Sequence, residues 1–599
     1  MAPSKVKADA KARSIATPTP SLDATRSEPV GLSPADIQAT SISTANVIPH
    51  AIKAAELLFL AAVSSPVSQM TLSPVYGSIP PSIYHRHLIM AAVLLAWTAK
   101  KTVVHEYVPK NVPNYLPLLA FCIPSIQFFL FQQSGWLGPR YGPVVTELFT
   151  YFPLVVLSVY SAAMFMDSVD LSQFDPRIQN AGPGIASYAL FSIAQRASTY
   201  LIRYKIGSSL LFTRWGLQSG VAAFYAVLLP SRVLLFAILP MLHSASLNPH
   251  APLEQTTGVL NAILHEHNYA LLARKESLTG YISVLDNTKE KFRVMRCDHS
   301  LLGGEWLQQP NAPSSRLTEP IYSVFTMLEA VRLIETASSK ESRLVPDNEK
   351  NALVIGLGIG TTPAALIAHG IDTTIVEIDP VVHELATKYF HLPSNHTSVI
   401  DDAMYFVGKA LVAGPDYYSY DYIIHDVFTG GAEPVGLFTE GFLAGLRDLL
   451  KPDGVVAINY AGDLSLPSAS LVVHTVRSVF PQCRYFREDA SLIQSSSSGS
   501  KKMAPDFTNM VMFCRKSSDA FGFRDPVEAD CLGSQARRYH LLPKHEIQAS
   551  YFEDRPGDGE LLVLKAGHTQ RLEADQKESA IGHWRIMRTV LPDVIWENW

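Results

Sequence analysis

The chain has 599 residues, of which 47% are hydrophobic and 17% charged, and its formal net charge is −5. An average soluble domain has about a quarter of its residues charged, so a purely soluble chain is disfavoured, and the apolar content excludes wholesale disorder. The lack of a basic excess predicts no nucleic-acid partner. The five cysteines form no CxxC pair and predict neither a disulfide framework nor a zinc site.

Residues 1–50 are rich in Ala, Ser, Thr and Pro and contain no apolar run, which predicts a disordered tail. The first stretch, MAPSKVKADAKAR, is basic, but no apolar segment follows it, so it is not a secretory signal peptide. An organelle transit sequence and a plain solvated tail both fit this stretch, and we favour the tail.

Residues 54–246 contain closely spaced apolar runs, such as AELLFLAAVSSPVSQMTLSPVYG and VVTELFTYFPLVVLSVYSAAMFM. Several reach the ~20 residues that cross a bilayer. We therefore expect six or seven transmembrane spans, an integral membrane protein and the lipid bilayer as a partner; a buried all-helical soluble core is the alternative. Basic residues crowd the loops near 100–110 and 203–214, which fall on opposite faces of a seven-span count, so the positive-inside rule leaves the orientation open.

Residues 258–335 contain short runs in which apolar and polar positions alternate. GYISVLD and KFRVMRC are typical of strands, and DNTKE between them is typical of a hairpin turn. We expect a small β-domain here. Two histidines in this range, His265 and His267, lack a third ligand, so no metal site is expected.

Residues 345–520 alternate strand and helix patterns. NALVIGLG, TTPAALIAHG, TTIVEID and PVVHELATKYF come first, and the apolar strands YDYIIHDVF and GVVAINY follow. This alternation predicts right-handed βαβ units and a Rossmann-like parallel sheet. Residues 521–599 are expected to form a charged C-terminal extension with a helix. The predicted fold class is a multi-span α-helical membrane region followed by an α/β part, in which a small β-domain precedes the sheet.

A glycine-rich turn follows the first strand of this sheet. Gly356, Gly358 and Gly360 allow a sharp turn and the close approach of a ligand to the backbone. Glu377 lies 21 residues beyond Gly356, at the end of the second strand, where a carboxylate can accept hydrogen bonds from ribose hydroxyls. NAD and S-adenosylmethionine (AdoMet) both fit; Asp402, after a third strand, favours AdoMet because an acid there can contact the adenine amino group.

Further segments show similarity to a known family: ESLTGYISVLD, RCDHSLLGGEW, EPIYSVF and YDYIIHDVFTGGAEPVGLFTEGF. With them the chain, from about residue 260 to 515, resembles the spermidine synthase-like family, the polyamine aminopropyltransferases, and especially its membrane-fused members. The resemblance assigns the adenosyl ligand to Gly356, Gly358, Gly360, Glu377 and Asp402. It gives Asp426 the task of positioning and deprotonating the attacking amine, and places Tyr322 on the substrate side. The structural alternatives are a cap on the following turn for Asp426 and a packed aromatic for Tyr322.

Two positions depart from the family pattern. Ile359 stands where aminopropyltransferases carry an Asp in the glycine turn, and Thr429 replaces a second Asp beyond Asp426. Both changes remove negative charge from the place that would hold a polyamine cation, and Glu433 compensates in part. The adenosyl site is thus expected to be retained and the acceptor site to be altered.

Three hypotheses follow. The first is transfer of an aminopropyl group from decarboxylated AdoMet to a small-molecule amine or other nucleophilic acceptor, with a role in polyamine biosynthesis. The second is an AdoMet-dependent methyltransferase, and the third a transporter or scaffold with a non-catalytic sensing domain. No metal is expected. We expect a cytosolic catalytic domain, in which the glycosylation sequon Asn395–His396–Thr397 would stay unused; a homodimer is left open.

Overall fold

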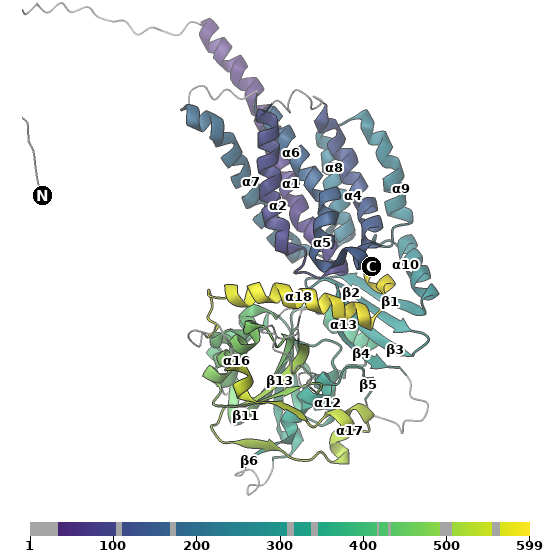
Figure 1. Ribbon diagram of the computed structural model, residues 1–599, viewed down its shortest axis with the longest axis vertical. Coiled ribbons are helices and arrows are strands. Elements are labelled where there is room, and N and C mark those ends of the chain that lie inside the picture. Colours follow the sequence, from purple (N-terminus) through teal and green to yellow (C-terminus); the bar gives the residue numbers. More distant parts are fainter. Residues whose placement is uncertain are drawn as a thin grey trace, which may run out of the picture.

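The computed structural model describes residues 34–102, 111–167, 175–307, 317–336, 345–415, 418–428, 430, 433–490, 506–553 and 563–599. A helical region occupies one end of the molecule, and a small and a large sheet occupy the other (Figure 1). Most of the expected tail lies outside the described residues, but helix α1 (Pro34–Tyr76) extends into it. Proline at the first helical position and glycine at Gly77, just past the end, suit these bounds.

Most helices of the helical region run side by side (Figure 1). Besides α1, they are α2 (Ser82–Lys101), α4 (Leu116–Phe131), α5 (Ser134–Phe149), α6 (Tyr151–Met166), α7 (Pro176–Lys205), α8 (Arg214–Leu228) and α9 (Ile238–Ser246). Six of them, α1, α2, α4, α6, α7 and α8, share one buried apolar core, in which small residues such as Ala61 and Ala120 allow close helix approach. A further helix, α10 (Glu254–Glu266), leads into the small sheet.

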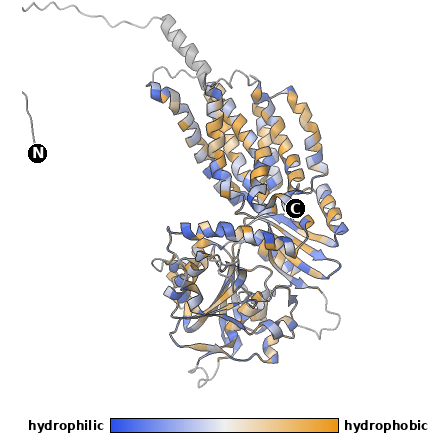
Figure 2. Cartoon of the chain, viewed as in Figure 1, coloured by the Kyte–Doolittle hydropathy of each residue, from blue (hydrophilic) through white to orange (hydrophobic). Residues whose placement is uncertain are grey.

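Two stretches of described helix, Pro49–Tyr76 and Val112–Phe131, are long and apolar enough to cross a bilayer, and the bent pair α5 and α6 is a third candidate. Elsewhere in the helical region large apolar side chains face outward: Leu95 is 60% exposed, Phe224 66% and Leu239 77%. Figure 2 shows hydrophobic residues along the length of these helices. This exposure disfavours a buried soluble core. Six or seven spans, and the membrane itself, stay a prediction.

The small β-domain is a five-stranded antiparallel sheet with its strands in chain order. They are β1 (Tyr269–Glu276), β2 (Tyr281–Asn287), β3 (Phe292–Cys297), β4 (Ser300–Trp306) and β5 (Glu319–Pro320). The predicted hairpin at DNTKE is confirmed, because β2 and β3 pair on either side of it. One face of this sheet packs against α13 (Pro380–Tyr389), which anchors the β-domain to the large sheet.

The large sheet has eight strands in the order β15–β12–β13–β11–β10–β7–β8–β9. Their bounds are β7 (Asn351–Ile355), β8 (Asp372–Glu377), β9 (Thr397–Ile400), β10 (Tyr420–His425), β11 (Leu450–Asp463), β12 (Gln482–Arg487), β13 (Phe507–Arg515) and β15 (His545–Ile547). Strands β7 to β11 are parallel, as predicted. At the other edge the sheet is antiparallel, because β13 runs antiparallel to β11 and β12; the Ser-rich sequence before β13 carries no pattern for a crossover helix.

Helices cover both faces of the large sheet, which explains the continuous apolar runs of its strands. One face carries α14 (Ala403–Ala413), α15 (Glu440–Leu449) and α16 (Pro467–Val479). The other carries α11 (Val324–Leu328), α12 (Thr361–Ala368) and α17 (Gln535–His540). Two short strands, β6 (Ile334–Thr336) and β14 (Phe521–Phe523), pair with each other.

The C-terminal extension adds a strand to the large sheet and packs against the small sheet and the helical region. It supplies β15 and the expected helix, α18 (Gln570–Val590), which lies between the helical region and the large sheet (Figure 1). The indole N–H of Trp584 on α18 donates to the carbonyl of Val75 in α1 at 2.9 Å. The last helix, α19 (Asp593–Glu597), buries Trp596 completely. The extension therefore joins the other regions to one another.

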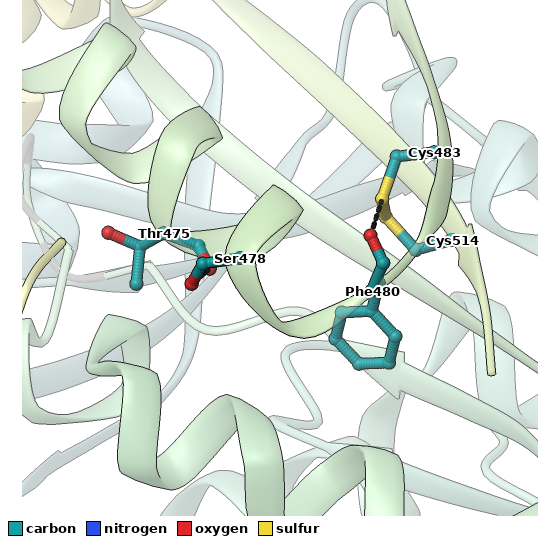
Figure 3. The surroundings of a disulfide bond; sticks show 5 residues. All are labelled: Thr475, Ser478, Phe480, Cys483 and Cys514. Atoms are coloured by element: carbon teal, nitrogen blue, oxygen red, sulfur yellow. Dashed lines mark hydrogen bonds between the residues drawn. A yellow bond between two sulfur atoms is a disulfide. The ribbon is translucent and has the colours of Figure 1, made fainter. Parts of the chain in front are cut away.

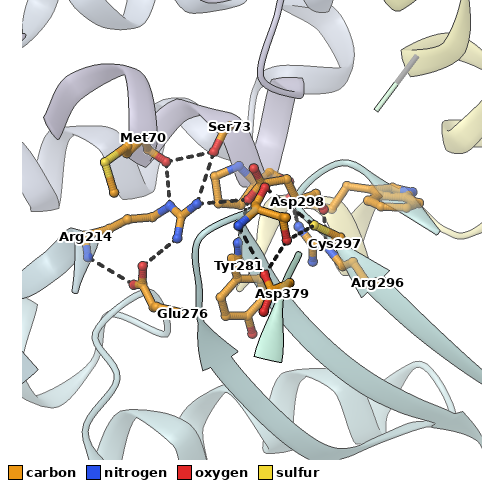
Figure 4. Close-up of polar contacts among 12 residues, drawn as sticks. Met70, Ser73, Arg214, Glu276, Tyr281, Arg296, Cys297, Asp298 and Asp379 are labelled. Carbon is orange, nitrogen blue, oxygen red and sulfur yellow. Dashed lines mark hydrogen bonds and ion pairs between the residues drawn. The ribbon is translucent and has the colours of Figure 1, made fainter. Parts of the chain in front are cut away.

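Buried charged residues also join the helical region to the β-domain (Figure 4). Arg214, the first residue of α8, is 2% exposed. It donates to the carboxylates of Glu276 at 2.5 Å and Asp298 at 3.1 Å, and to a carbonyl of α1 at 2.6 Å. Arg296 in β3 donates to the carbonyl of Asp298 at 2.6 Å and to another carbonyl of α1. We refer to Arg214, Glu276, Asp298 and Arg296 as the junction cluster.

A disulfide links the two strands at the antiparallel edge of the large sheet. Cys483 in β12 and Cys514 in β13 are register partners, and their sulfurs are bonded. The cysteine pattern predicted no disulfide framework, and it gave no sign of this single disulfide. The two cysteines lie 31 residues apart with no motif between them, and only the strand register brings them together.

Candidate active site

The carboxyl ends of three neighbouring parallel strands meet at one edge of the large sheet. β7 runs into the glycine turn, β8 ends at Glu377, and Asp426 directly follows β10. The chain order reverses between β7 and β10, since β8 and β9 lie to one side of β7 and β10 and β11 to the other. Ligands of open α/β sheets bind at such a switch point. The structure thus brings most of the predicted site residues together.

The glycine turn has no room for side chains at two of its positions. Gly356 has a φ of +87°, and a Cβ there would lie 2.1 Å from the carbonyl oxygen of Asp426. Gly358 has a φ of +55°, and its Cβ would lie 2.6 Å from the carbonyl oxygen of Leu302 in β4. The third glycine, Gly360, is the N-cap of α12. The turn is therefore enclosed between Asp426 and the β-domain.

Glu377 fastens the glycine turn to the second strand. Its carboxylate accepts hydrogen bonds from the backbone N–H groups of Leu357 and Asp379, each at 2.9 Å. Burial disfavours the charged form and raises the pKa of Glu377 to about 7. A carboxylate has about four acceptor positions, so two remain for ribose hydroxyls. The residue fits the role assigned to it.

Asp402 lies beside Glu377, at the start of α14. The backbone N–H of Asp401 donates to the carbonyl of Glu377 at 3.1 Å, so the ends of β8 and β9 adjoin. The carboxylate of Asp402 accepts from the N–H of Met404 at 2.8 Å, so Asp402 also caps this helix. Ile378 is 40% exposed and Met404 49%. These side chains offer apolar surface for an adenine ring.

A pair of buried carboxylates lies on the other side of the glycine turn. Asp426 accepts a hydrogen bond from Nδ2 of Asn459 at 2.9 Å, and burial raises its pKa to about 6. Glu433 is 4% exposed; its Oε1 accepts from the N–H of Ala461 at 2.8 Å, and its Oε2 has no hydrogen-bond partner among the described residues. Burial and the nearby charge of Asp426 raise the pKa of Glu433. The pair is therefore suited to a ligand that carries positive charge or donates protons.

Two residues that support this pair are not predicted by the sequence analysis. Asn459 lies in β11 beside Asp426, and its own Oδ1 has no partner within the described part of the chain. A polar residue that interrupts the apolar run GVVAINY is a usable signal for it. Gln576 on α18 donates to the carbonyl of Glu433 at 2.6 Å. No local pattern marks Gln576, because the contact joins segments 143 residues apart.

Tyr322 lies at the margin of the site. Its ring packs edge-on against Phe325, with ring centroids 6.2 Å apart, and Phe325 lines the same pocket as Asp426. Burial raises the pKa of Tyr322 to about 12, and its buried hydroxyl has no partner among the described residues. Tyr322 is thus a packed aromatic whose hydroxyl remains free for a ligand.

The departures from the aminopropyltransferase pattern have a structural counterpart at one position. Ile359 is 5% exposed, and its side chain lies against Gly303 in β4, so the glycine turn presents no side-chain charge there. Thr429 lies outside the described residues. His265 and His267 are exposed at the end of α10, and the described part of the chain contains no group of three or more metal-ligating side chains.

Two pockets flank the glycine turn. The pocket beside Asp426 is lined by Leu302 and Phe325, among others, and encloses about 10 Å³, which is room for about one water. The other, on the side of Phe390 and His391, encloses about 270 Å³. The first pocket is far smaller than a ligand site, so it can enclose only a small part of a ligand.

One similarity to known proteins is confined to part of the chain that includes the large sheet. Residues 336–494 match the spermine/spermidine synthase domain. The polyamine aminopropyltransferase of Vibrio vulnificus is 37% identical over 142 residues, which cover 22% of this chain and 45% of that protein. The solved spermidine synthase of Thermotoga maritima aligns with a TM-score of 0.29 and 20% identity, over 42% of this chain and 74% of that chain.

A second similarity extends over almost the whole chain. The N-terminal histidine N-methyltransferase of Emericella nidulans is 49% identical over 555 residues, which cover 91% of this chain and 97% of that protein. Such coverage includes the helical region and the β-domain as well as the large sheet.

Proposed function

The chain belongs to the family of the N-terminal histidine N-methyltransferase of Emericella nidulans, and on that premise we propose that it is a membrane-anchored methyltransferase that uses AdoMet to modify a nitrogen of an N-terminal histidine. The observation that carries this proposal is 49% identity over 97% of that relative. Aminopropyl transfer, the first expectation from the sequence, is supported only by matches to the sheet region. Both kinds of match are to transferases, which leaves a non-catalytic scaffold without support.

The glycine turn supports a methyl donor. AdoMet keeps the carboxylate that decarboxylated AdoMet lacks, and an acid at position 359 would repel it. The apolar, buried side chain of Ile359 removes that repulsion. Glu377 keeps acceptor positions for the ribose, and Ile378 offers surface for the adenine. When bound, AdoMet supplies a methyl group activated by its sulfonium.

Asp426 is the residue best suited to act on the acceptor nitrogen. A nitrogen attacks a methyl group with its lone pair, so any proton on it must leave. The pKa of Asp426, about 6, lies close to neutral pH, where a general base is most effective. Asn459 holds Oδ1 of Asp426 at 2.9 Å and thereby orients the carboxylate. We assign proton removal from the acceptor to Asp426.

Glu433 supports an acceptor with two nitrogen-bearing groups. An N-terminal histidine carries an α-amino group and an imidazole, and the site offers two neighbouring carboxylates. The unpartnered Oε2 of Glu433 is buried, and leaving such a group unpaired costs free energy that a donor from the acceptor would recover. We assign to Glu433 the binding of the nitrogen group that is not methylated.

Anchoring in a membrane rests on the helical region. Two helical stretches and one bent pair are long and apolar enough to cross a bilayer, and large side chains such as Phe224 and Leu239 face outward. Exposed apolar surface of this kind is stable in lipid and prone to aggregation in water. We expect the full chain to stay in the membrane fraction after alkaline carbonate extraction; release into the soluble fraction would contradict the anchoring.

The enzymatic proposal is tested with the full chain purified in detergent. AdoMet is supplied with three matched peptides that begin with His, with Ala, or with Nα-acetylated His, and products are read by mass spectrometry. A parallel reaction contains decarboxylated AdoMet and putrescine. We expect one added methyl group on the first residue of the His peptide and no reaction of the Ala peptide. Spermidine formation without peptide methylation would instead support aminopropyl transfer.

A further inference from the structure

The disulfide between β12 and β13 of the large sheet indicates on which side of the membrane the large sheet lies. Figure 3 shows the sulfur–sulfur bond between Cys483 and Cys514 beside the end of α16. Cys514 is fully buried in β13, and Cys483 is its register partner in β12. Disulfides form and persist in oxidising compartments such as the lumen of the endoplasmic reticulum, and are rare in the cytosol. A structural disulfide therefore favours a lumenal domain.

An independent feature of the same domain fits that side of the membrane. Asn395, His396 and Thr397 form a sequon for N-linked glycosylation, with no proline at its middle position. Asn395 and His396 lie between α13 and β9, and Thr397 is the first residue of β9, the edge strand of the large sheet. Both Asn395 and Thr397 are exposed. The acceptor amide is thus accessible on a surface loop.

The charges at the two ends of the helical region do not oppose a lumenal domain. Arg203 and Lys205 are exposed at the end of α7 that adjoins the β-domain, and Lys100 and Arg177 lie near the opposite end. Arg214 belongs to the same basic stretch as Arg203 and Lys205, but its charge is paired with Glu276 and Asp298. Basic residues therefore stand at both ends, and loop charge does not decide the orientation.

We propose that the β-domain and the large sheet lie on the oxidising, lumenal side of the membrane, where Cys483 and Cys514 are joined and Asn395 carries an N-linked glycan. The proposal rests on the membrane anchoring proposed above and not on the identity of the acceptor. The cytosolic placement expected from the sequence has no comparable support in the structure.

The test uses the full chain expressed in yeast and collected in sealed microsomes. Maleimide labelling of the denatured chain, with and without prior reduction, reads the thiols, endoglycosidase H reads the glycan, and protease added before denaturation reads the side of the membrane. We expect a protected domain, two thiols that become reactive only after reduction, and a mass decrease with endoglycosidase H. Asn395→Gln and Thr397→Val should abolish that decrease, whereas Thr397→Ser, which keeps the sequon, should retain it.

The outcomes separate the parts of the proposal. Digestion of the domain in sealed microsomes, with both thiols reactive before reduction, would overturn the lumenal placement. A protected domain without a glycan would overturn Asn395 as the modification site. Release of the wild-type chain by carbonate would instead contradict the membrane anchoring, which is a separate failure.

Discussion

Two clusters of buried charge in this protein differ in how completely they are paired. In the junction cluster, no fully buried side-chain nitrogen or oxygen lacks a hydrogen-bond partner. In the site, Oε2 of Glu433, Oδ1 of Asn459 and the hydroxyl of Tyr322 are buried without a partner in the described part of the chain. An unpaired buried polar group costs about 1–3 kcal/mol. The buried polar groups that join the helical region to the β-domain are thus all hydrogen-bonded, whereas several at the expected ligand site are not.

The comparison assigns different consequences to similar substitutions. A change in the junction cluster should reduce stability, because it leaves opposite charges buried without a partner. Neutralising Asp426 or Glu433 at the site should reduce activity and leave stability unchanged or higher, because burial already disfavours the charged form of both carboxylates. The following predictions test this division, from the largest expected effect to the smallest.

Asp426→Asn should have the largest effect on catalysis. The substitution keeps the shape of the side chain and removes the proton acceptor, and general-base catalysis contributes about 10²–10⁴-fold to a rate. Turnover should fall by that factor, while AdoMet affinity, measured by calorimetry, should change by no more than a few fold. The free energy of unfolding should equal or exceed that of the wild type. An active Asn variant would remove Asp426 from the mechanism.

Arg214→Met should have the largest effect on stability. It leaves the carboxylates of Glu276 and Asp298 buried without their cation, and breaking a buried pair in this way costs about 3–5 kcal/mol. Unfolding of the full chain in detergent should report this loss. The matched control is Arg140→Met, which breaks an exposed pair with Glu578 and should cost about 0–1 kcal/mol. Equal losses in both variants would contradict the structural role of the junction cluster.

Glu377→Gln should weaken donor binding by at least about tenfold. A hydrogen bond to a charged group is worth about 1.5–3 kcal/mol, and the ribose hydroxyls would lose such a partner. Gln keeps the length of the side chain and one acceptor oxygen, so it retains one of the two backbone N–H contacts of Glu377, whereas Ala loses both. Glu384→Gln on α13, an exposed residue paired with Lys275, is the control and should bind AdoMet normally. Unchanged affinity in Glu377→Gln would reassign the ribose contact.

The smallest expected effect is a pH dependence. Asp426 must be ionised to accept a proton, and its pKa is about 6, so turnover at saturating donor should rise about twofold from pH 6 to pH 7. The raised pKa of Glu377, about 7, should make AdoMet affinity rise over a higher range. The free energy of unfolding should change with pH in the opposite direction to turnover. The folded state binds the protons of Asp426 and Glu377 more tightly than the unfolded chain does, so this free energy should fall as pH rises from about 4 to 7. A flat turnover profile would argue against Asp426 as the base.

The contrast between the clusters also explains what could be predicted from the sequence. The glycine turn, Glu377 and Asp426 follow directly from apolar strands, and their positions at strand ends place them together. Arg214 is different, because it stands in a basic loop and its partners are 62 and 84 residues away. The pairing of Cys483 with Cys514 and the contact of Gln576 with Glu433 likewise depend on tertiary arrangement. Local patterns predicted the elements and the site, and could not predict contacts between distant segments.

The central claim is that the two buried carboxylates of the site, Asp426 and Glu433, hold the acceptor, and binding of the acceptor tests it most directly. The measurement is the affinity of the full chain for a His-initiated peptide, with S-adenosylhomocysteine present, for the wild type and for Glu433→Gln. Glu305→Gln is the control, because Glu305 is also buried but accepts a hydrogen bond from Thr318 at 2.6 Å. We predict peptide affinity at least about tenfold weaker in Glu433→Gln and unchanged in the control, with no loss of stability in Glu433→Gln. Equal affinity in all three proteins, or a loss of stability alone in Glu433→Gln, would contradict the account.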